Sequence, residues 1–368
     1  MKKVGIVTWF GGSNYGTSLQ AYALCYKLEQ YGVKPYLLQK CLSWRNVAGI
    51  FVRYIKGVNR PNSQEGFSAI KRRKIRDFKR KEFNQFPVCF GYIGRMIYTL
   101  QINNLDCIIS GSDQLWNPFY TEPFLLLKNL KVKKKYSYAS SIGVSEIPEV
   151  VRPMYRDALS DFEAISVRET TAIEPLKQLT NKPIIKVVDP TFLLKTEDWI
   201  QFASHSTLQQ SITNQPYVLC YFIAENDFYW ECVADLRKNT GINRVIVLPM
   251  KPSHFKYQYE ILETAGIHDF VRLIADSSLV CTDSFHATAI SINLRKEFIT
   301  LLRFKYLEYA SQNSRIYDLL QRYKLEDRLL KGPLTSPLKK IDYSEPMRVL
   351  DNDREKSISY IENILKKI

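Results

Sequence analysis

The sequence predicts an α/β protein made of two doubly wound, Rossmann-like domains, and three observations lead to this fold class. The chain has 368 residues, more than one hydrophobic core usually fills. Short apolar runs alternate with helix-like segments over most of its length, as a parallel sheet requires. A polar stretch at 195–215 without an obvious buried face separates two such series, so we expect the linker there.

The first domain, expected over 1–200, begins with an apolar strand at 4–9 and the glycine loop GGSNYG at 11–16. A helix with apolar residues at helical spacing and a strand at 33–38 follow. Strand, loop, helix, strand is a βαβ unit, which requires a parallel sheet. Further strands are expected at 105–110, 135–141, 164–167 and 184–188, and helices near 152–162 and 170–179.

Residues 43–100 carry no fold-defining strand pattern. Segments 47–55 and 71–83 combine apolar residues with many Lys and Arg residues, which is typical of amphipathic basic helices. We therefore expect a basic helical insertion in the first domain.

The second domain is expected over 201–340, followed by a C-terminal tail at 341–368. Its strands are predicted at 217–223, 244–248, 279–282 and 298–302, and its helices near 227–238, 268–276, 286–293 and 314–320, with a last helix near 352–366 in the tail. Two such domains face to face leave a cleft between them, which is the natural place for a site.

The chain is strongly basic, with a net charge of +15 and a pI near 9.3. This charge favours an anionic partner: a phosphorylated substrate, an acidic glycan, an anionic lipid surface or nucleic acid. The chain contains no recognised nucleic-acid module, so we expect no such partner. The basic segments at 45–60 and 71–83 fit both a peripheral contact with an anionic membrane and a solvated basic face.

The seven cysteines form no CxxC pair and no cluster at zinc spacing, so we expect reduced thiols, no metal and a cytoplasmic protein. The N-terminal apolar run is too short for a signal peptide. No stretch approaches the ~20 apolar residues that cross a bilayer.

Polar clusters repeatedly follow the predicted strands, where ligands bind in open parallel sheets. GGSNYG matches neither the dinucleotide fingerprint nor a phosphate-binding Walker loop, but it places backbone N–H groups at a helix N-terminus. In SGSDQLWNP at 110–118, Asp113 fits either a base for a sugar hydroxyl or a helix cap. Trp116 fits either a sugar-stacking ring or a core residue.

Arg168 and His286 each come directly after a predicted strand. A guanidinium there can bind a phosphate or carboxylate bidentately, or pair with Glu169 or Asp189 inside the protein. An imidazole at a helix N-terminus suits proton transfer beside a phosphate, although a structural histidine fits as well. Asp283 is placed either to orient His286 or to cap its helix.

Seven segments together resemble the polysaccharide pyruvyl transferase family. In chain order they are NYGTSLQAYAL (14–24), DCIISGSDQLWNP (106–118), YSYASSIG (136–143), FEAISVRE (162–169), VVDPTFLL (187–194), DSSLVCTDSFHATAISI (276–292) and NSRIYDLLQRYKLEDRL (313–329). The set covers most of the chain from about 4 to 330. GSDQxWNP and TDSFHxT are specific in combination, whereas 43–100 and the C-terminal tail have no match.

The resemblance implies a fold like that of the GT-B glycosyltransferases, with a C-terminal helix that crosses back to the first domain. It also implies phosphoenolpyruvate as the donor substrate, with no cofactor and no metal. The implied acceptor is a hexose of a bacterial exopolysaccharide or capsule, often still linked to polyprenyl diphosphate at the inner membrane face. The enzyme would then be cytoplasmic or peripheral at that face.

Residue by residue, the resemblance carries catalytic roles to Arg168, His286 and Asp113. Arg168 would bind the donor carboxylate or phosphate, His286 would contact phosphate and act as the acid, and Asp113 would be the base near the acceptor. Many family members have Arg two residues before the histidine, where this chain has Ser284, and the branch usually has Gly where it has Ala287.

Arg303 and Arg315 are the candidates for the missing cation. The residues expected to contact substrates are Asn14, Tyr15, Gly16, Ser112, Gln114, Trp116, Asp283, Ser284, Arg303 and Arg315. Two other functions fit the same patterns: a GT-B glycosyltransferase that uses a nucleotide sugar, and a catalytically degenerate glycan-binding homologue.

Overall fold

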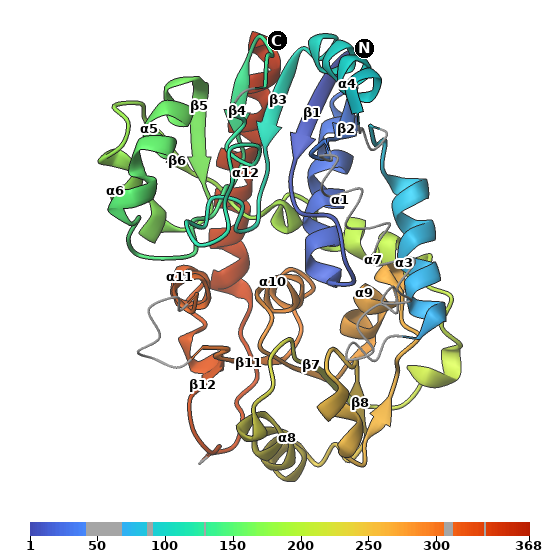
Figure 1. The fold of residues 1–368 in the computed structure, drawn as a ribbon. Helices are drawn as coiled ribbons and strands as arrows, with labels where there is room; N and C mark the ends of the chain where they lie inside the picture. Colours follow the sequence, from blue (N-terminus) through green and yellow to red (C-terminus); the bar gives the residue numbers. More distant parts are fainter. Residues whose placement is uncertain (42–67, 87–90, 129, 305–311, 335) are drawn as a thin grey trace.

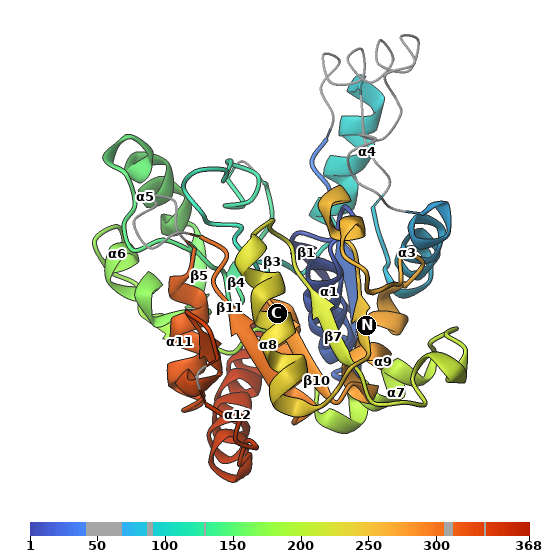
Figure 2. The same ribbon diagram turned by 90° about the horizontal axis from the view of Figure 1, so that it is seen from below.

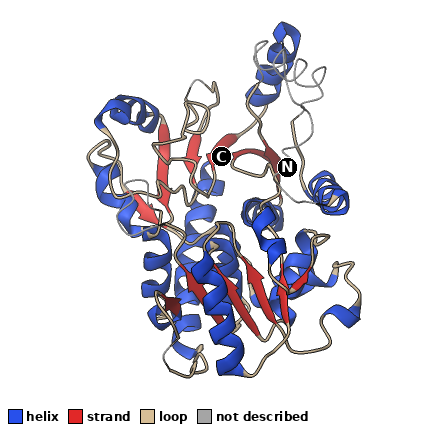
Figure 3. Ribbon diagram, turned by 60° about the horizontal axis from the view of Figure 1, so that its bottom comes forward, coloured by secondary structure: helices blue, strands red, loops and turns tan. Residues whose placement is uncertain are grey.

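The computed structural model describes residues 1–41, 68–86, 91–128, 130–304, 312–334 and 336–368. Within them the chain forms two six-stranded parallel sheets in separate bodies, one above the other (Figures 1 and 3). The strand orders are β2-β1-β3-β4-β5-β6 and β12-β11-β10-β7-β8-β9. The predicted α/β architecture with two doubly wound domains is confirmed.

The first sheet has helices on both faces. Val4 and Ile6 pack into the hydrophobic cluster that contains the first helix, whereas Val7 and Ile108 pack into a second cluster with Tyr155. Covered faces explain why these strands are apolar runs rather than alternating patterns. Its strands are β1 (Lys2–Val7), β2 (Val33–Leu37), β3 (Cys107–Ser110), β4 (Lys135–Ser137), β5 (Phe162–Val167) and β6 (Ile184–Lys186). Its helices are α1 (Tyr15–Gln30), α3 (Ala69–Glu82), α4 (Gly91–Asn103), α5 (Arg152–Ser160) and α6 (Ile173–Lys177).

The second sheet follows the same plan. Its strands are β7 (Val218–Tyr221), β8 (Val245–Val247), β9 (Glu260–Ile261), β10 (Leu279–Thr282), β11 (Phe298–Leu301) and β12 (Leu329–Leu330). Its helices are α8 (Asp227–Thr240), α9 (Ile267–Asp276), α10 (Phe285–Asn293) and α11 (Ser314–Arg322). The edge strands β9 and β12 have two residues each and were not predicted, because so short a strand leaves no pattern.

The last helix, α12 (Ser344–Lys367), returns from the second domain to the first (Figure 1). The Tyr360 hydroxyl donates to the Ser137 carbonyl at 2.9 Å, and Lys2 Nζ donates to the Leu365 carbonyl at 2.5 Å. The crossing that the resemblance implied is therefore confirmed, and the helix begins earlier than the expected residue 352.

The prediction that 195–215 has no buried face is wrong over its first part, whereas residues 205–215 have no buried side chain. Helix α7 (Thr196–Ser204) occupies its first part and packs against α9. Trp199, Phe202 and Ala203 are buried, at the spacing i, i+3, i+4 that marks one helical face. Glu197 and Asp198 precede these residues and Gln201 lies among them, so the sequence shows no clear apolar pattern there.

The predicted basic helix at 71–83 is confirmed as α3, whereas the one predicted at 47–55 lies outside the described residues. The buried free thiols are Cys25, Cys107, Cys220, Cys232 and Cys281. Cys41 is disulfide-bonded, so the expectation of reduced cysteines throughout is wrong at that position. Among the helices described, none combines the length and apolar character that a bilayer crossing needs.

The strand orders fix where ligands can bind. In the first sheet, β1 lies between β2 and β3, and in the second, β7 lies between β8 and β10. At such points the connections leave in opposite directions and open a crevice beyond the carboxyl ends of the strands. The loops after β1, β3, β7 and β10 are therefore the structural positions for a site.

Candidate active site

One buried carboxylate, Asp189, joins four segments of the chain. It follows β6, and its Oδ1 accepts from the Thr191 backbone N–H at 3.0 Å. Its Oδ2 accepts from Arg168 Nη1 at 2.9 Å and from Ser112 Oγ at 3.1 Å. Nε2 of His286 lies 3.5 Å from the same oxygen. Asp189 therefore brings together Arg168 and His286, the two residues that the sequence predicted as most important. Asp189 itself was considered only as an ion-pair partner of Arg168.

Asp189 is ionised in this environment. Burial alone would raise the pKa of its carboxyl, but His286 and then Arg168 outweigh that effect and lower the pKa well below the usual value. The carboxylate can therefore orient the imidazole.

His286 reaches this position because of the start of α10. Ser284 is the N-cap of the helix, and its side chain accepts from the Ala287 backbone N–H. From the first domain, Gly16 approaches so closely that a Cβ added to it would lie 2.4 Å from His286 Nδ1. Asn14 caps α1 and accepts from the Gly16 N–H at 2.9 Å. The N-terminal ends of α1 and α10 thus meet at the histidine.

Arg168 is held between the two domains. Besides the Asp189 contact, its Nε lies 3.5 Å from Glu169 Oε2, and its guanidinium carbon lies 4.2 Å from the ring centre of Phe285 in α10. Its Nη2 is buried and has no hydrogen-bond partner in the described part of the chain. An unfilled buried donor is costly, and an anion beside it would remove that cost.

Arg315 of α11 is a second buried guanidinium near the first. It donates to the Gln312 carbonyl at 3.3 Å and, with the Gln114 amide turned to satisfy both of its ends, to Gln114 Oε1 at 2.7 Å. No carboxylate within the described residues forms an ion pair with it. Burial, together with the charges of Arg168 and Arg303, lowers the pKa of Arg315 to about 9. The three guanidiniums repel one another, and an anion among them would relieve the repulsion.

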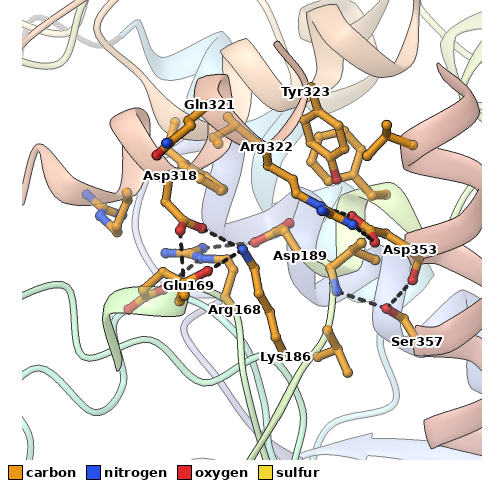
Figure 4. Close-up of a pocket in the computed structure, with 18 of the residues that line it drawn as sticks. Arg168, Glu169, Lys186, Asp189, Asp318, Gln321, Arg322, Tyr323, Asp353 and Ser357 are labelled. Carbon is orange, nitrogen blue, oxygen red and sulfur yellow. Dashed lines mark hydrogen bonds and ion pairs between the residues drawn. The ribbon is translucent and has the colours of Figure 1, made fainter. Parts of the chain in front are cut away.

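A cavity of about 590 Å³ lies beside these arginines, between the first domain, α11 and α12 (Figure 4). This volume is typical of small-molecule sites. Its charged lining is largely paired: Lys186 Nζ lies 3.0 Å from Asp318 Oδ2, and Arg322 pairs with Asp353. Arg315 lines the cavity without such a pair. Arg168, Asp189 and Phe285 also line it.

The sequence comparison identifies the family. The family model for polysaccharide pyruvyl transferase matches residues 14–303. The chain belongs to this family. The match includes Arg168, Asp189 and His286, and ends at Arg303. No curated protein matches the chain in sequence.

Solved structures resemble the chain in fold. UDP-N-acetylglucosamine 2-epimerase from Rickettsia bellii has a TM-score of 0.54 at 11% identity, over 100% of this chain and 96% of that chain. The epimerase from Neisseria meningitidis gives 0.51 at 12%, over 100% of both chains. A putative epimerase from Listeria monocytogenes gives 0.51 at 12%, over 97% of this chain and 91% of that one. These similarities show the fold, two Rossmann-like domains of the GT-B type, and nothing about the reaction.

Two residues that were expected to bind substrate in this pyruvyl transferase family member are core residues instead. Trp116 is fully buried, donates from Nε1 to Ser110 Oγ at 3.0 Å and packs edge-on against Phe162. Tyr15 stacks on Phe270 with 4.5 Å between the ring centres, and its hydroxyl donates to a backbone carbonyl. Both rings lie in loops or helix ends near the site, but they point into the protein.

Asp283 neither orients His286 nor caps α10. Its carboxylate accepts from the backbone N–H groups of Ile223 and Ala224 at 2.7 and 2.9 Å, which fixes the loop after β7. Arg303 is half-buried, with Nε 3.6 Å from Asp283 Oδ2. This arginine is therefore partly neutralised, which leaves Arg315 as the stronger candidate cation.

Asp113 lies in the loop after β3 with a φ of +72°, a left-handed conformation that non-glycine residues rarely adopt. Its Oδ1 accepts from the Gln114 backbone N–H at 2.9 Å. The negative charge of Asp113 contributes to the raised pKa of Arg168 and opposes the lowering of the Arg315 pKa. Asp113 therefore lies on the side of the site where these two arginines are. It does not line the cavity described above, and neither does His286.

Proposed function

We propose that the chain transfers pyruvate from phosphoenolpyruvate to a hexose of a bacterial surface polysaccharide, or of its lipid-linked precursor, as a cyclic ketal. Family membership supports a polysaccharide pyruvyl transferase. The single observation that supports this donor is the pair of buried guanidiniums, Arg168 with an unfilled donor and Arg315 without a carboxylate. In the proposed reaction phosphoenolpyruvate is a substrate, and no cofactor or metal takes part.

Phosphoenolpyruvate carries a carboxylate and a phosphate, and two guanidiniums can bind two such groups through paired N–H donors. Arg168 is the proposed partner of one anionic group and Arg315 of the other. Arg315 would then supply the positive charge that many family members carry two residues before the histidine, where this chain has Ser284. Arg303 contributes less positive charge, because Asp283 partly neutralises it.

His286 is the proposed acid. The protonated imidazole, oriented by Asp189, gives a proton to the methylene carbon of phosphoenolpyruvate, and C2 becomes electrophilic. A sugar hydroxyl attacks C2 and loses its proton to a base, for which Asp113 is the candidate. A second hydroxyl of the same sugar then forms a bond to C2 as the C2–O bond to phosphate breaks. The proton of this hydroxyl goes to the departing phosphate, which leaves as hydrogen phosphate. Positioned acids and bases of this kind contribute about 10²–10⁴-fold to the rate.

The cavity beside Arg168 is the proposed place for the acceptor glycan, whose reacting sugar would extend past Arg168 and Arg315 towards His286 and Asp113, which do not line the cavity. Its walls beyond the arginines offer hydroxyl, ammonium and carboxylate groups that suit a hexose (Figure 4). Among them are Tyr323, Lys356 and Asp318. The identity of the hexose and of the two reacting hydroxyls depends on contacts at these walls.

The test is to incubate the purified chain with phosphoenolpyruvate and a panel of short hexose-containing glycans. Phosphate release and the mass of a pyruvyl ketal on the glycan are followed in the same samples. The proposal expects both to appear together and in equal amounts. Phosphate release without a ketal, or neither product with any acceptor including a polyprenyl-linked one, would contradict it.

A nucleotide-sugar reaction is the second candidate, because the structures with the same fold are nucleotide-sugar enzymes and the Neisseria one contains UDP-GlcNAc. Thermal unfolding distinguishes the two. Phosphoenolpyruvate should raise the midpoint, and UDP-GlcNAc should leave it unchanged. A glycan-binding homologue without activity would be stabilised by glycans alone.

A further inference from the structure

Helix α4 exposes an apolar face to solvent on the outside of the first domain. Five large side chains of this 13-residue helix are between 46% and 84% exposed. Their spacing of i, i+1, i+4, i+5 and i+8 places them on one face of the helix. They are Tyr92, Ile93, Met96, Ile97 and Leu100.

This outer face is not needed to hold α4 in place. The opposite face packs on the domain through Tyr98 and Ile102, which are buried, and the Tyr98 hydroxyl donates to the Gln39 carbonyl at 2.7 Å. A surface helix usually carries polar residues on its outer side. A contiguous exposed apolar face instead marks a surface that binds something.

Helix α3, on the same side of the domain, is strongly basic. Figures 1 and 2 both place α3 and α4 on the same flank of the first sheet. Ile75 and Phe78 anchor α3 by their buried side chains, and the helix carries eight basic and two acidic residues. Its exposed cations are Arg72, Arg73, Arg76, Arg80 and Lys81.

We infer that this flank, the apolar face of α4 together with the exposed cations of α3, docks the protein on an anionic lipid bilayer. Helices with an apolar face and neighbouring basic residues lie in the membrane interface with their apolar side chains among the acyl chains. Basic residues near an anionic bilayer each add to the attraction. The net charge of +15 acts in the same direction.

A second copy of the chain fits this surface less well. The helix is about 20 Å long at ~1.5 Å per residue. Stable protein interfaces bury about 800 Å² on each partner, far more than five side chains on one such helix provide. A two-fold dimer through α4 would also bring the basic α3 helices of both copies together, and their charges would repel.

The experiment is co-sedimentation of the full chain with vesicles of zwitterionic lipid, with and without added anionic phosphatidylglycerol. The chain should bind the anionic vesicles and bind much less in high salt. The partition of the variant I93Q/I97Q/L100Q onto anionic vesicles should be at least about tenfold lower than that of the wild type. The partition of R73Q/R76Q should be about thirtyfold lower. The control variants V150Q/I200Q and K131Q/K177Q, exposed elsewhere, should bind like the wild type.

Equal binding of the α4 variant and the wild type would overturn the inference. A chain that is a dimer in sedimentation equilibrium and becomes a monomer after the α4 substitutions would also overturn it. The same holds for an α4 variant that is less stable in thermal unfolding but partitions onto vesicles like the wild type. Turnover on a soluble glycan acceptor should be unchanged in these variants. This readout separates failure of the docking inference from failure of the proposed reaction.

Discussion

Arg168 and His286 meet at one oxygen atom, Oδ2 of Asp189, at 2.9 Å from the guanidinium and 3.5 Å from the imidazole. The arginine comes from the end of β5 in the first domain and the histidine from the start of α10 in the second. A guanidinium and an imidazole that share one carboxylate belong to one site across the domain interface. The proposed chemistry depends on this arrangement.

Gly16→Ala tests the position of His286 without removing it. The added Cβ would lie 2.4 Å from Nδ1, so the imidazole must move. We expect turnover to fall at least about tenfold, because small displacements of a catalytic group are costly. His286→Ala should lose about 10²–10⁴-fold. Gly11→Ala, in the loop that precedes α1 and with no atom within 4 Å of the added carbon, is the control and should retain activity. Similar rates for Gly16→Ala and Gly11→Ala would contradict the assignment of His286.

Asp113 can be tested separately from its backbone strain. Asp113→Gly suits the φ of +72° but has no carboxylate, whereas Asp113→Asn keeps the side-chain shape and a residue type that tolerates this conformation. If Asp113 is the base, both variants should lose about 10²-fold or more in kcat. Full activity of the glycine variant would show that only the backbone conformation matters.

Arg168→Ala should unfold more easily than the wild type. Removing the guanidinium leaves Asp189 buried without the cation that contacts it most closely, at a cost of about 3–5 kcal/mol. Arg168→Lys keeps the charge but loses the paired donors. It should retain most of the stability and raise the KM for phosphoenolpyruvate. Chemical unfolding and steady-state kinetics on the two variants check this, and equal stability of both would contradict the burial argument.

The stability that Asp189 contributes should depend on pH. The pKa of Asp189 is lowered in the folded chain, so its ionised form contributes stability at neutral pH that is lost as the pH falls below the unfolded value, about 4. Asp189→Asn lacks this contribution. The difference in free energy of unfolding between the wild type and this variant should therefore narrow as the pH falls below about 4. A difference that stays constant from pH 7 to pH 3 in urea titrations would show that Asp189 does not stabilise the fold in its ionised form.

The elements that the sequence predicted correctly are those with a local pattern. The buried strands β3 and β10 are continuous apolar runs, and α12 is a long amphipathic segment. The edge strands β9 and β12 are too short to leave a pattern. In α7 two acidic residues precede the few buried ones, and only the partner helix α9 reveals that those residues are buried.

The site was predictable in position but not in orientation. Arg168 follows β5 of the first sheet and His286 follows β10 of the second, and ligands bind beyond the carboxyl ends of parallel strands. The direction of each side chain depends on partners far away in sequence. Trp116 points inward because it packs against Phe162, and Tyr15 points inward because it stacks on Phe270. Nothing near these residues in the chain indicates those partners.

The most direct test of the donor site is calorimetric titration of phosphoenolpyruvate into the wild type and into Arg315→Met. Arg315 is a buried cation without a carboxylate partner among the described residues, so an apolar residue of similar length should leave the melting temperature of the free protein equal or higher. The account predicts one donor bound per wild-type chain and an affinity lower by about tenfold or more in the variant. Arg322→Lys, whose arginine is paired with Asp353 in the same cavity, should bind nearly as the wild type does. Unchanged affinity in Arg315→Met would contradict the account.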